Sequence, residues 1–101
     1  MKMLLDVNFP HEPFNTLVKE GKIEDVMNRI LEELKPENCY FVEQHGKRNA
    51  MLILDIDHAS QIPSYAEPFF LTFNADCRFR IAMTAEDLGS SGLNQLGKKW
   101  L

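Results

Sequence analysis

The sequence has no apolar run long enough to cross a bilayer, since polar residues interrupt every apolar stretch well short of the roughly 20 residues required. A secretory leader is not expected either, because Asp6 and Asn8 break the apolar pattern of residues 1–9. Only two cysteines are present, Cys39 and Cys77, and neither has the spacing of a zinc motif. These features predict reduced thiols in a cytoplasmic protein with no membrane partner.

Motifs of several common chemistries are also missing. The five glycines form no phosphate-binding loop, and no serine lies in the sequence of a nucleophile elbow. The 11 basic residues form no long run, and the net charge of −4 gives no general attraction for nucleic acid. We therefore predict no cofactor, no metal and no nucleic-acid partner.

Patterned segments follow one another along the 101 residues. Residues 1–9 and 77–83 alternate as strands do, residues 14–34 repeat at helical spacing, residues 38–56 hold two apolar runs around a polar turn, and residues 59–73 are helical or broken-helical. This β-α-β-β-α-β order is typical of a ferredoxin-like α+β fold. It predicts one domain, residues 1–101, with a four-stranded antiparallel sheet in the order 4-1-3-2 and helices on one face.

Glycine and proline positions suggest where the helices end. Gly21 is expected to divide residues 14–34 into two helices, and Pro68 to begin a second helix within residues 59–73. A further helix is predicted near the C-terminus, because Thr84 is a good cap and an acidic residue follows three positions later. Its apolar stripe would be Leu88, Leu93, Leu96 and Trp100.

One face of the predicted sheet is left without helices, and it mixes large apolar with charged side chains. A five-residue hairpin loop, with Val42 opposite Leu52, assigns to this face Leu4, Asp6, Asn8, Cys39, Phe41, Glu43, Met51, Ile53, Asp55, Arg78 and Arg80. Large apolar residues on such a face are often buried against a second copy, so we predict a homodimer. On the opposite face, Ile81 is expected to join Ile30 in the core.

The candidate ligand-binding residues are the polar ones of this face: Asp6, Asn8, Asp55, Arg78 and Arg80. Arg80 is expected beside Asp6, with spare guanidinium donors for a carboxylate or a phosphate. The same charges could instead form a cross-strand ladder that only fixes the register. His11 and His45 are weaker candidates for a general base, and each could equally be a solvated loop residue.

Several short runs resemble a family of bacterial proteins of similar length that is classed as a domain of unknown function. They include Glu12-Pro13-Phe14-Asn15, Glu67-Pro68-Phe69, Leu71-Thr72-Phe73-Asn74-Ala75-Asp76 and Leu96-Gly97-Lys98-Lys99-Trp100. The resemblance implies the dimeric α/β-barrel superfamily, whose subunits are ferredoxin-like. That superfamily includes cofactor-independent monooxygenases, isomerases, haem-degrading enzymes and ligand-sensing domains. No residue matches their motifs, so no catalytic residue carries over.

The leading functional expectation is a homodimer that binds a small polar or anionic molecule between its two sheets. A second possibility is a metal-independent isomerase or monooxygenase-like enzyme that uses His11 or His45 with a carboxylate. A third is a purely structural dimer that binds no ligand.

Overall fold

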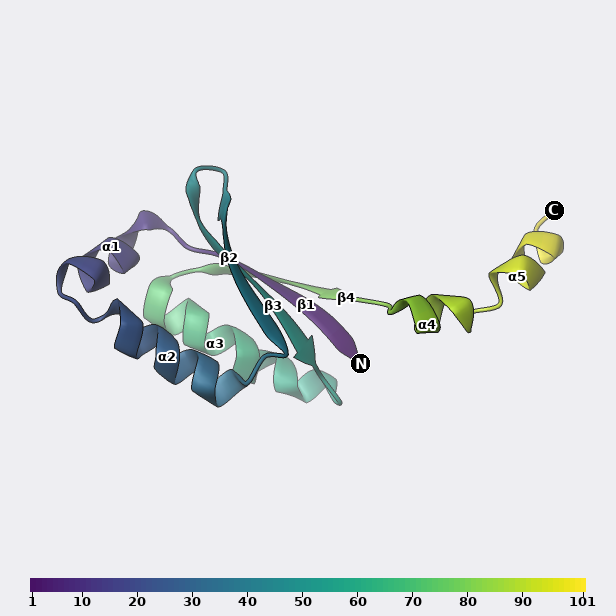
Figure 1. Ribbon diagram of the computed structural model, residues 1–101, viewed down its shortest axis with the longest axis horizontal. Helices are drawn as coiled ribbons and strands as arrows, with labels where there is room; N and C mark the ends of the chain where they lie inside the picture. The colour runs from purple at the N-terminus through teal and green to yellow at the C-terminus, as the bar shows by residue number, and fades with distance from the viewer.

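The computed structural model describes all of residues 1–101. Its elements are β1 (Lys2–Asn8), α1 (His11–Lys19), α2 (Ile23–Leu34), β2 (Asn38–Gln44), β3 (Lys47–Asp55), the 3₁₀ turn η1 (Ala59–Gln61), α3 (Ile62–Phe73), β4 (Asp76–Ile81), α4 (Ala85–Gly89) and α5 (Leu93–Lys99). The strands form one antiparallel sheet in the order β2-β3-β1-β4, and α2 and α3 lie on the same side of it (Figure 1). The predicted α+β class with a four-stranded antiparallel sheet is confirmed.

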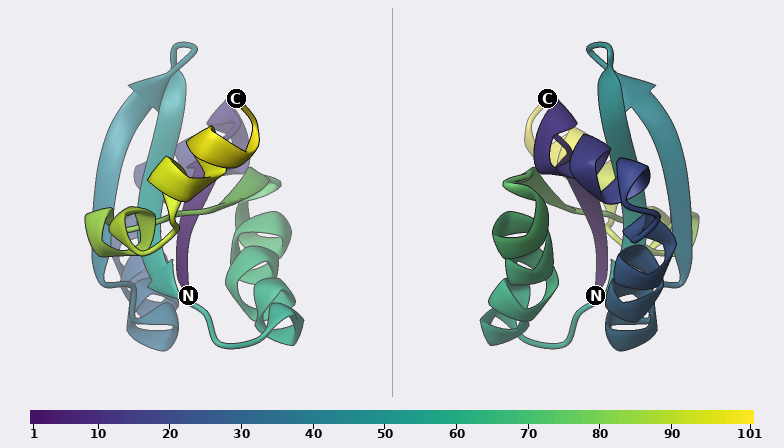
Figure 2. Two further views of the ribbon diagram at one scale, coloured as in Figure 1. Left: turned by 90° about the vertical axis from the view of Figure 1, so that its right-hand side faces the viewer. Right: turned by 90° about the vertical axis from the view of Figure 1, so that its left-hand side faces the viewer.

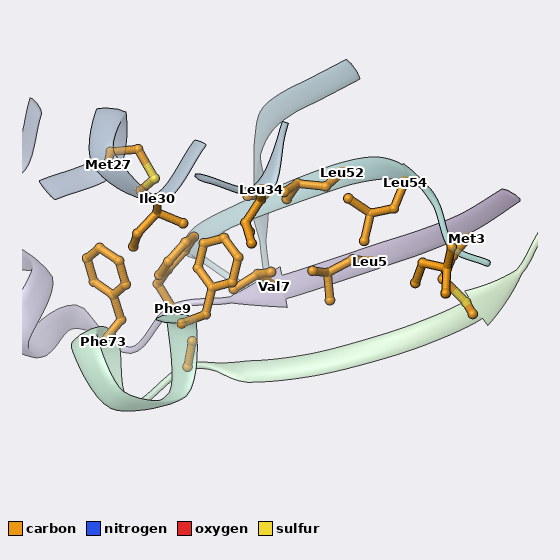
Figure 3. Close-up of a cluster of buried hydrophobic side chains, with 14 residues drawn as sticks. Met3, Leu5, Val7, Phe9, Met27, Ile30, Leu34, Leu52, Leu54 and Phe73 are labelled. Atoms are coloured by element: carbon orange, nitrogen blue, oxygen red, sulfur yellow. The ribbon is translucent and has the colours of Figure 1, made fainter. Parts of the chain in front are cut away.

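The core lies between the sheet and the helices α2 and α3, as Figure 3 shows. Alternate residues of β1 and the residue that follows it, Met3, Leu5, Val7 and Phe9, are buried there. They meet Met27, Ile30 and Leu34 of α2, which are spaced by three and four residues and therefore share one helix face. The period-2 and period-3.6 patterns in the sequence thus select the buried faces correctly.

The expected break at Gly21 is present, whereas the expected break at Pro68 is wrong. Gly21 has a φ of +70° between α1 and α2, a conformation that glycine adopts without strain. Pro68, however, lies inside the continuous helix α3. Proline there removes a backbone hydrogen bond. Burial of Phe69 and Phe73 on one side of the same helix offsets that loss.

The hairpin register differs from the predicted one because the turn is shorter than expected. Its two central residues, His45 and Gly46, have φ values of +54° and +75°, as a two-residue type I′ turn requires. Cys39 therefore lies opposite Leu52, where Val42 was predicted. This shift of register by an odd number of residues exchanges the two faces of β2. Cys39 and Phe41 turn to the helix side, and Tyr40 shares the open face.

The C-terminal segment forms an arm, residues 82–101, that leaves the sheet beyond β4 (Figures 1 and 2). Thr84 and Asp87 form the predicted capping box of α4. The single C-terminal helix that was expected is instead two short helices, α4 and α5. The prediction that Ile81 is a core residue is wrong, since it is 68% exposed. Its side chain faces the helix side by alternation, but it lies at the end of an edge strand where no helix covers it.

Candidate functional site

A polar pocket of about 50 Å³ lies on the open sheet face beside the hairpin turn. All four strands or their ends contribute to it, and no hydrophobic residue lines it. The lining residues are Asp6, Asn8, Gln44, His45, Asn49, Asp76 and Arg78. Of the seven predicted site residues, the structure therefore brings Asp6, Asn8, Arg78 and His45 together.

Asn49 holds the centre of this polar pocket in place. It is the one buried polar residue of the chain, with 2% of its surface exposed. Its Nδ2 donates to Oδ1 of Asp6 at 2.6 Å, and its Oδ1 accepts from Nδ2 of Asn8 at 3.2 Å. Both amide groups and the carboxylate are thus fixed before any ligand arrives, which lowers the entropic cost of binding.

Arg78, rather than Arg80, is the strand neighbour of Asp6, so the predicted pairing of Asp6 with Arg80 is wrong. The antiparallel register places Arg78 opposite Asp6 and Arg80 opposite Leu4. Neither arginine has a carboxylate within 4.0 Å, and the ion pairs of the chain involve other residues. The guanidinium of Arg78 therefore stands at the polar pocket with its donors free of any ion pair.

The other three predicted site residues lie away from the polar pocket. Asp55 is at the opposite end of β3, where its Oδ1 accepts from the amino group of Met1 at 2.8 Å. That hydrogen bond and charge hold the pKa of Asp55 below its usual value. His11 borders a separate shallow hollow together with Glu43 and Arg48, and Arg80 lines neither of these hollows.

Three lining residues, Gln44, Asn49 and Asp76, were not predicted from the sequence. The sequence predicted Gln44 as the last residue of a strand and Asn49 as part of a five-residue loop, residues 45–49, because this run without apolar residues concealed the two-residue turn. The available signal of a two-residue turn was the pair His45-Gly46, because histidine and glycine both tolerate positive φ better than most residues. The strand that was expected to begin at Cys77 begins at Asp76, directly opposite Asn8.

Both cysteines are free, and neither has the environment of a nucleophile. Burial raises the pKa of the Cys39 thiol. Burial, together with the charges of Asp76 and Glu67, raises the pKa of Cys77 to about 11. A reactive cysteine needs the opposite shift, because the thiolate is the attacking species.

Cys77 is accordingly expected to react with iodoacetamide at pH 8 roughly 10- to 100-fold more slowly than an unperturbed thiol, because little of it is thiolate at that pH. Peptide mass spectrometry of samples quenched at intervals gives the rate for each cysteine. The same chain alkylated in urea is the control, since unfolding removes the burial. Equal rates in the folded and unfolded chains would contradict this assignment.

The structure holds neither a cluster of metal ligands nor a helix that could cross a membrane. No group of three or more histidine, cysteine or carboxylate side chains is placed to hold a metal ion. None of the helices combines the length and the apolar character that crossing a membrane demands. Comparisons with known protein families, with curated proteins and with solved structures find no match to this chain.

Proposed function

We propose that this protein binds a small polar molecule with an anionic group in the polar pocket of its open sheet face. The supporting observation is the free guanidinium of Arg78 beside the carboxylate of Asp6 and the amide of Asn8, both of which Asn49 already holds. Arg78 is suited to a carboxylate or phosphate, which it can hold by two parallel hydrogen bonds. Asp6 and Asp76 can accept hydrogen bonds from hydroxyl or ammonium groups of the same ligand.

The proposed fold of the chain is ferredoxin-like. It is supported by the element order and by the strand order, which reads 4-1-3-2 from the β4 edge. Membership of the dimeric α/β-barrel superfamily remains a proposal that rests on the resemblance of short sequence runs. Two free cysteines fit a reducing compartment such as the cytoplasm.

A second subunit is expected to complete the ligand site. The polar pocket of one chain, about 50 Å³, admits little more than a carboxylate group, whereas small-molecule sites usually measure about 300–1,000 Å³. Tyr40 is exposed on the same face, and Leu4, Met51 and Ile53 are only partly covered. Packing two open faces together would bury these apolar residues and enclose the rest of the ligand.

The proposal is tested by thermal denaturation with a panel of carboxylates, hydroxy acids, amino acids and sugar phosphates. A ligand that binds only the folded chain raises its melting temperature in proportion to affinity and concentration. For a compound that does so, Arg78→Gln is expected to weaken binding by roughly 10- to 100-fold, the cost of losing hydrogen bonds to a charged partner.

Arg80→Gln is the matched control, since Arg80 lies two residues further along the same strand face and outside the polar pocket. It removes the same charge and is expected to leave affinity within about threefold. Equal losses in the two variants would mean that only net charge matters. The absence of any stabilising compound in the panel would also count against the proposal.

An enzyme remains the second candidate, because His45 lines the same polar pocket as Asp6. Its Nε2 lies 3.2 Å from Nε2 of Gln44, at the tip of the hairpin. A proton-transfer reaction would need this imidazole as its base. Nuclear magnetic resonance of each bound compound over time separates the two functions, since an enzyme converts its ligand and a binding protein returns it unchanged.

A further inference from the structure

The C-terminal arm leaves far more surface uncovered than a folded chain of this size normally exposes. The accessible surface is 7238 Å², about 1,300 Å² above the roughly 5,900 Å² expected for 11.7 kDa. The radius of gyration is 17.2 Å, against about 13 Å for a compact domain of this length. Figure 1 shows the cause, with α4 and α5 extended beyond β4 and away from the other helices.

The exposed side chains of this arm form a helical docking pattern. Leu93, Leu96 and Trp100 follow one another at positions i, i+3 and i+7, the spacing with which a helix inserts one apolar face into a groove. All three are exposed, and Trp100 is 77% exposed. Two positively charged residues, Lys98 and Lys99, lie in the last turn of α5, which contains no acidic residue.

A groove of about 720 Å³ between α2 and α3 has matching properties. Its lining combines apolar surface with the carboxylates of Glu33 and Glu67, the guanidinium of Arg29 and two hydroxyl side chains. Leu71 is 81% exposed there. Neither Glu33 nor Glu67 has a cationic group within 4.0 Å. The groove thus offers apolar surface and two unpaired carboxylates against one arginine, so its net charge is negative.

Length and charge both fit the arm to this groove. The seven residues of α5 extend about 10 Å, which equals the length of α2 from Val26 to Glu33. Lys98 and Lys99 would meet the carboxylates of the groove while the apolar stripe covers its floor. The arm leads away from its own α2 and α3, so a second chain is the acceptor that its direction favours.

We infer that α5 of one chain docks in the groove between α2 and α3 of a second copy. The surplus surface of about 1,300 Å² per chain exceeds the roughly 800 Å² that each partner buries in a standard stable interface. The contact uses neither the polar pocket nor the open sheet face. It therefore stands or falls separately from the proposed ligand binding.

Trp100 is the only tryptophan of the chain, so its fluorescence reports directly on the arm. With increasing protein concentration, its emission is expected to shift to shorter wavelength as α5 enters the groove of another chain. Leu71→Glu introduces charge at an exposed groove position, and we expect it to raise the protein concentration needed for the Trp100 shift at least about tenfold. Val18→Glu, at another exposed apolar helix position outside the groove, is the control and is expected to associate normally.

Mixing two defective chains distinguishes docking between chains from docking within one. The first carries Leu71→Glu and keeps Trp100, and the second carries Leu96→Glu with Trp100→Phe, so it has an intact groove and no tryptophan. We expect the emission of the first chain to shift to shorter wavelength when the second is added. No shift on mixing, a shift that is independent of concentration, or dimers with fully exposed Trp100 would each overturn the inference.

Discussion

Replacing Phe73 with alanine is expected to lower the free energy of unfolding by about 3–5 kcal/mol. Its ring is fully buried, and the ring centroids of Phe9 and Phe14 lie 5.0 Å and 5.3 Å away. Truncation would leave a cavity at the point where α1, α3 and the end of β1 meet, and these elements cannot all move in to fill it. Urea denaturation followed by circular dichroism measures the loss.

Phe70 provides a matched control on the same helix. Its ring is 39% exposed, so Phe70→Ala is expected to cost about 1 kcal/mol or less. The two variants remove the same atoms from α3 and differ only in the burial of the site. Similar losses for both would contradict the packing of α3 against the sheet described here.

Removing the Asn49 amide is expected to lower the free energy of unfolding by roughly 1–3 kcal/mol in Asn49→Ala. The substitution deprives Oδ1 of Asp6 of its donor and leaves the amide of Asn8 with only its long hydrogen bond of 3.5 Å to the carbonyl oxygen of Gln44. The cost comes mainly from the Asp6 carboxylate, which is partly shielded from water and loses its hydrogen-bond donor. The same variant should lose ligand affinity, because the polar pocket is no longer held in shape.

Asn38→Ala is the control for this variant. Asn38 is an exposed asparagine of β2, and its side chain makes no hydrogen bond within the protein. We expect a change within about 0.5 kcal/mol, as is usual for a surface position. If Asn49→Ala were equally harmless, the hydrogen-bonded chain from Asn8 to Asp6 would not be a structural element of the site.

Alternation along the strands was enough to predict which face each residue of β1 and β4 occupies. It placed Asp6, Asn8 and Arg78 on one face, and the structure brings all three to one pocket. Alternation does not, however, determine the register of two paired strands, because a shift by two residues leaves every side chain on the same face. Arg80 was therefore placed on the correct face but opposite the wrong residue of β1.

Features that depend on how two segments of the chain pack together could not be predicted from the sequence. The hairpin register follows from the turn at His45 and Gly46, and a longer loop was equally compatible with the polar run around them. The exposure of Ile81 depends on how far the helices extend along the sheet. The alternation of β4 shows which face Ile81 occupies but not whether a helix covers that position. Asn49 became a site residue only because the short turn brought it into β3, opposite Asn8.

Chemical-shift mapping with the compound that gives the largest thermal stabilisation tests the role of the polar pocket most directly. In a ¹⁵N-labelled sample, we predict the largest shifts for the side-chain amides of Asn8 and Asn49 and for the Nε–H group of Arg78. The corresponding group of Arg80 should change little, because it lies outside the polar pocket. Shifts that concentrate instead at Arg29 and the groove between α2 and α3 would contradict the account.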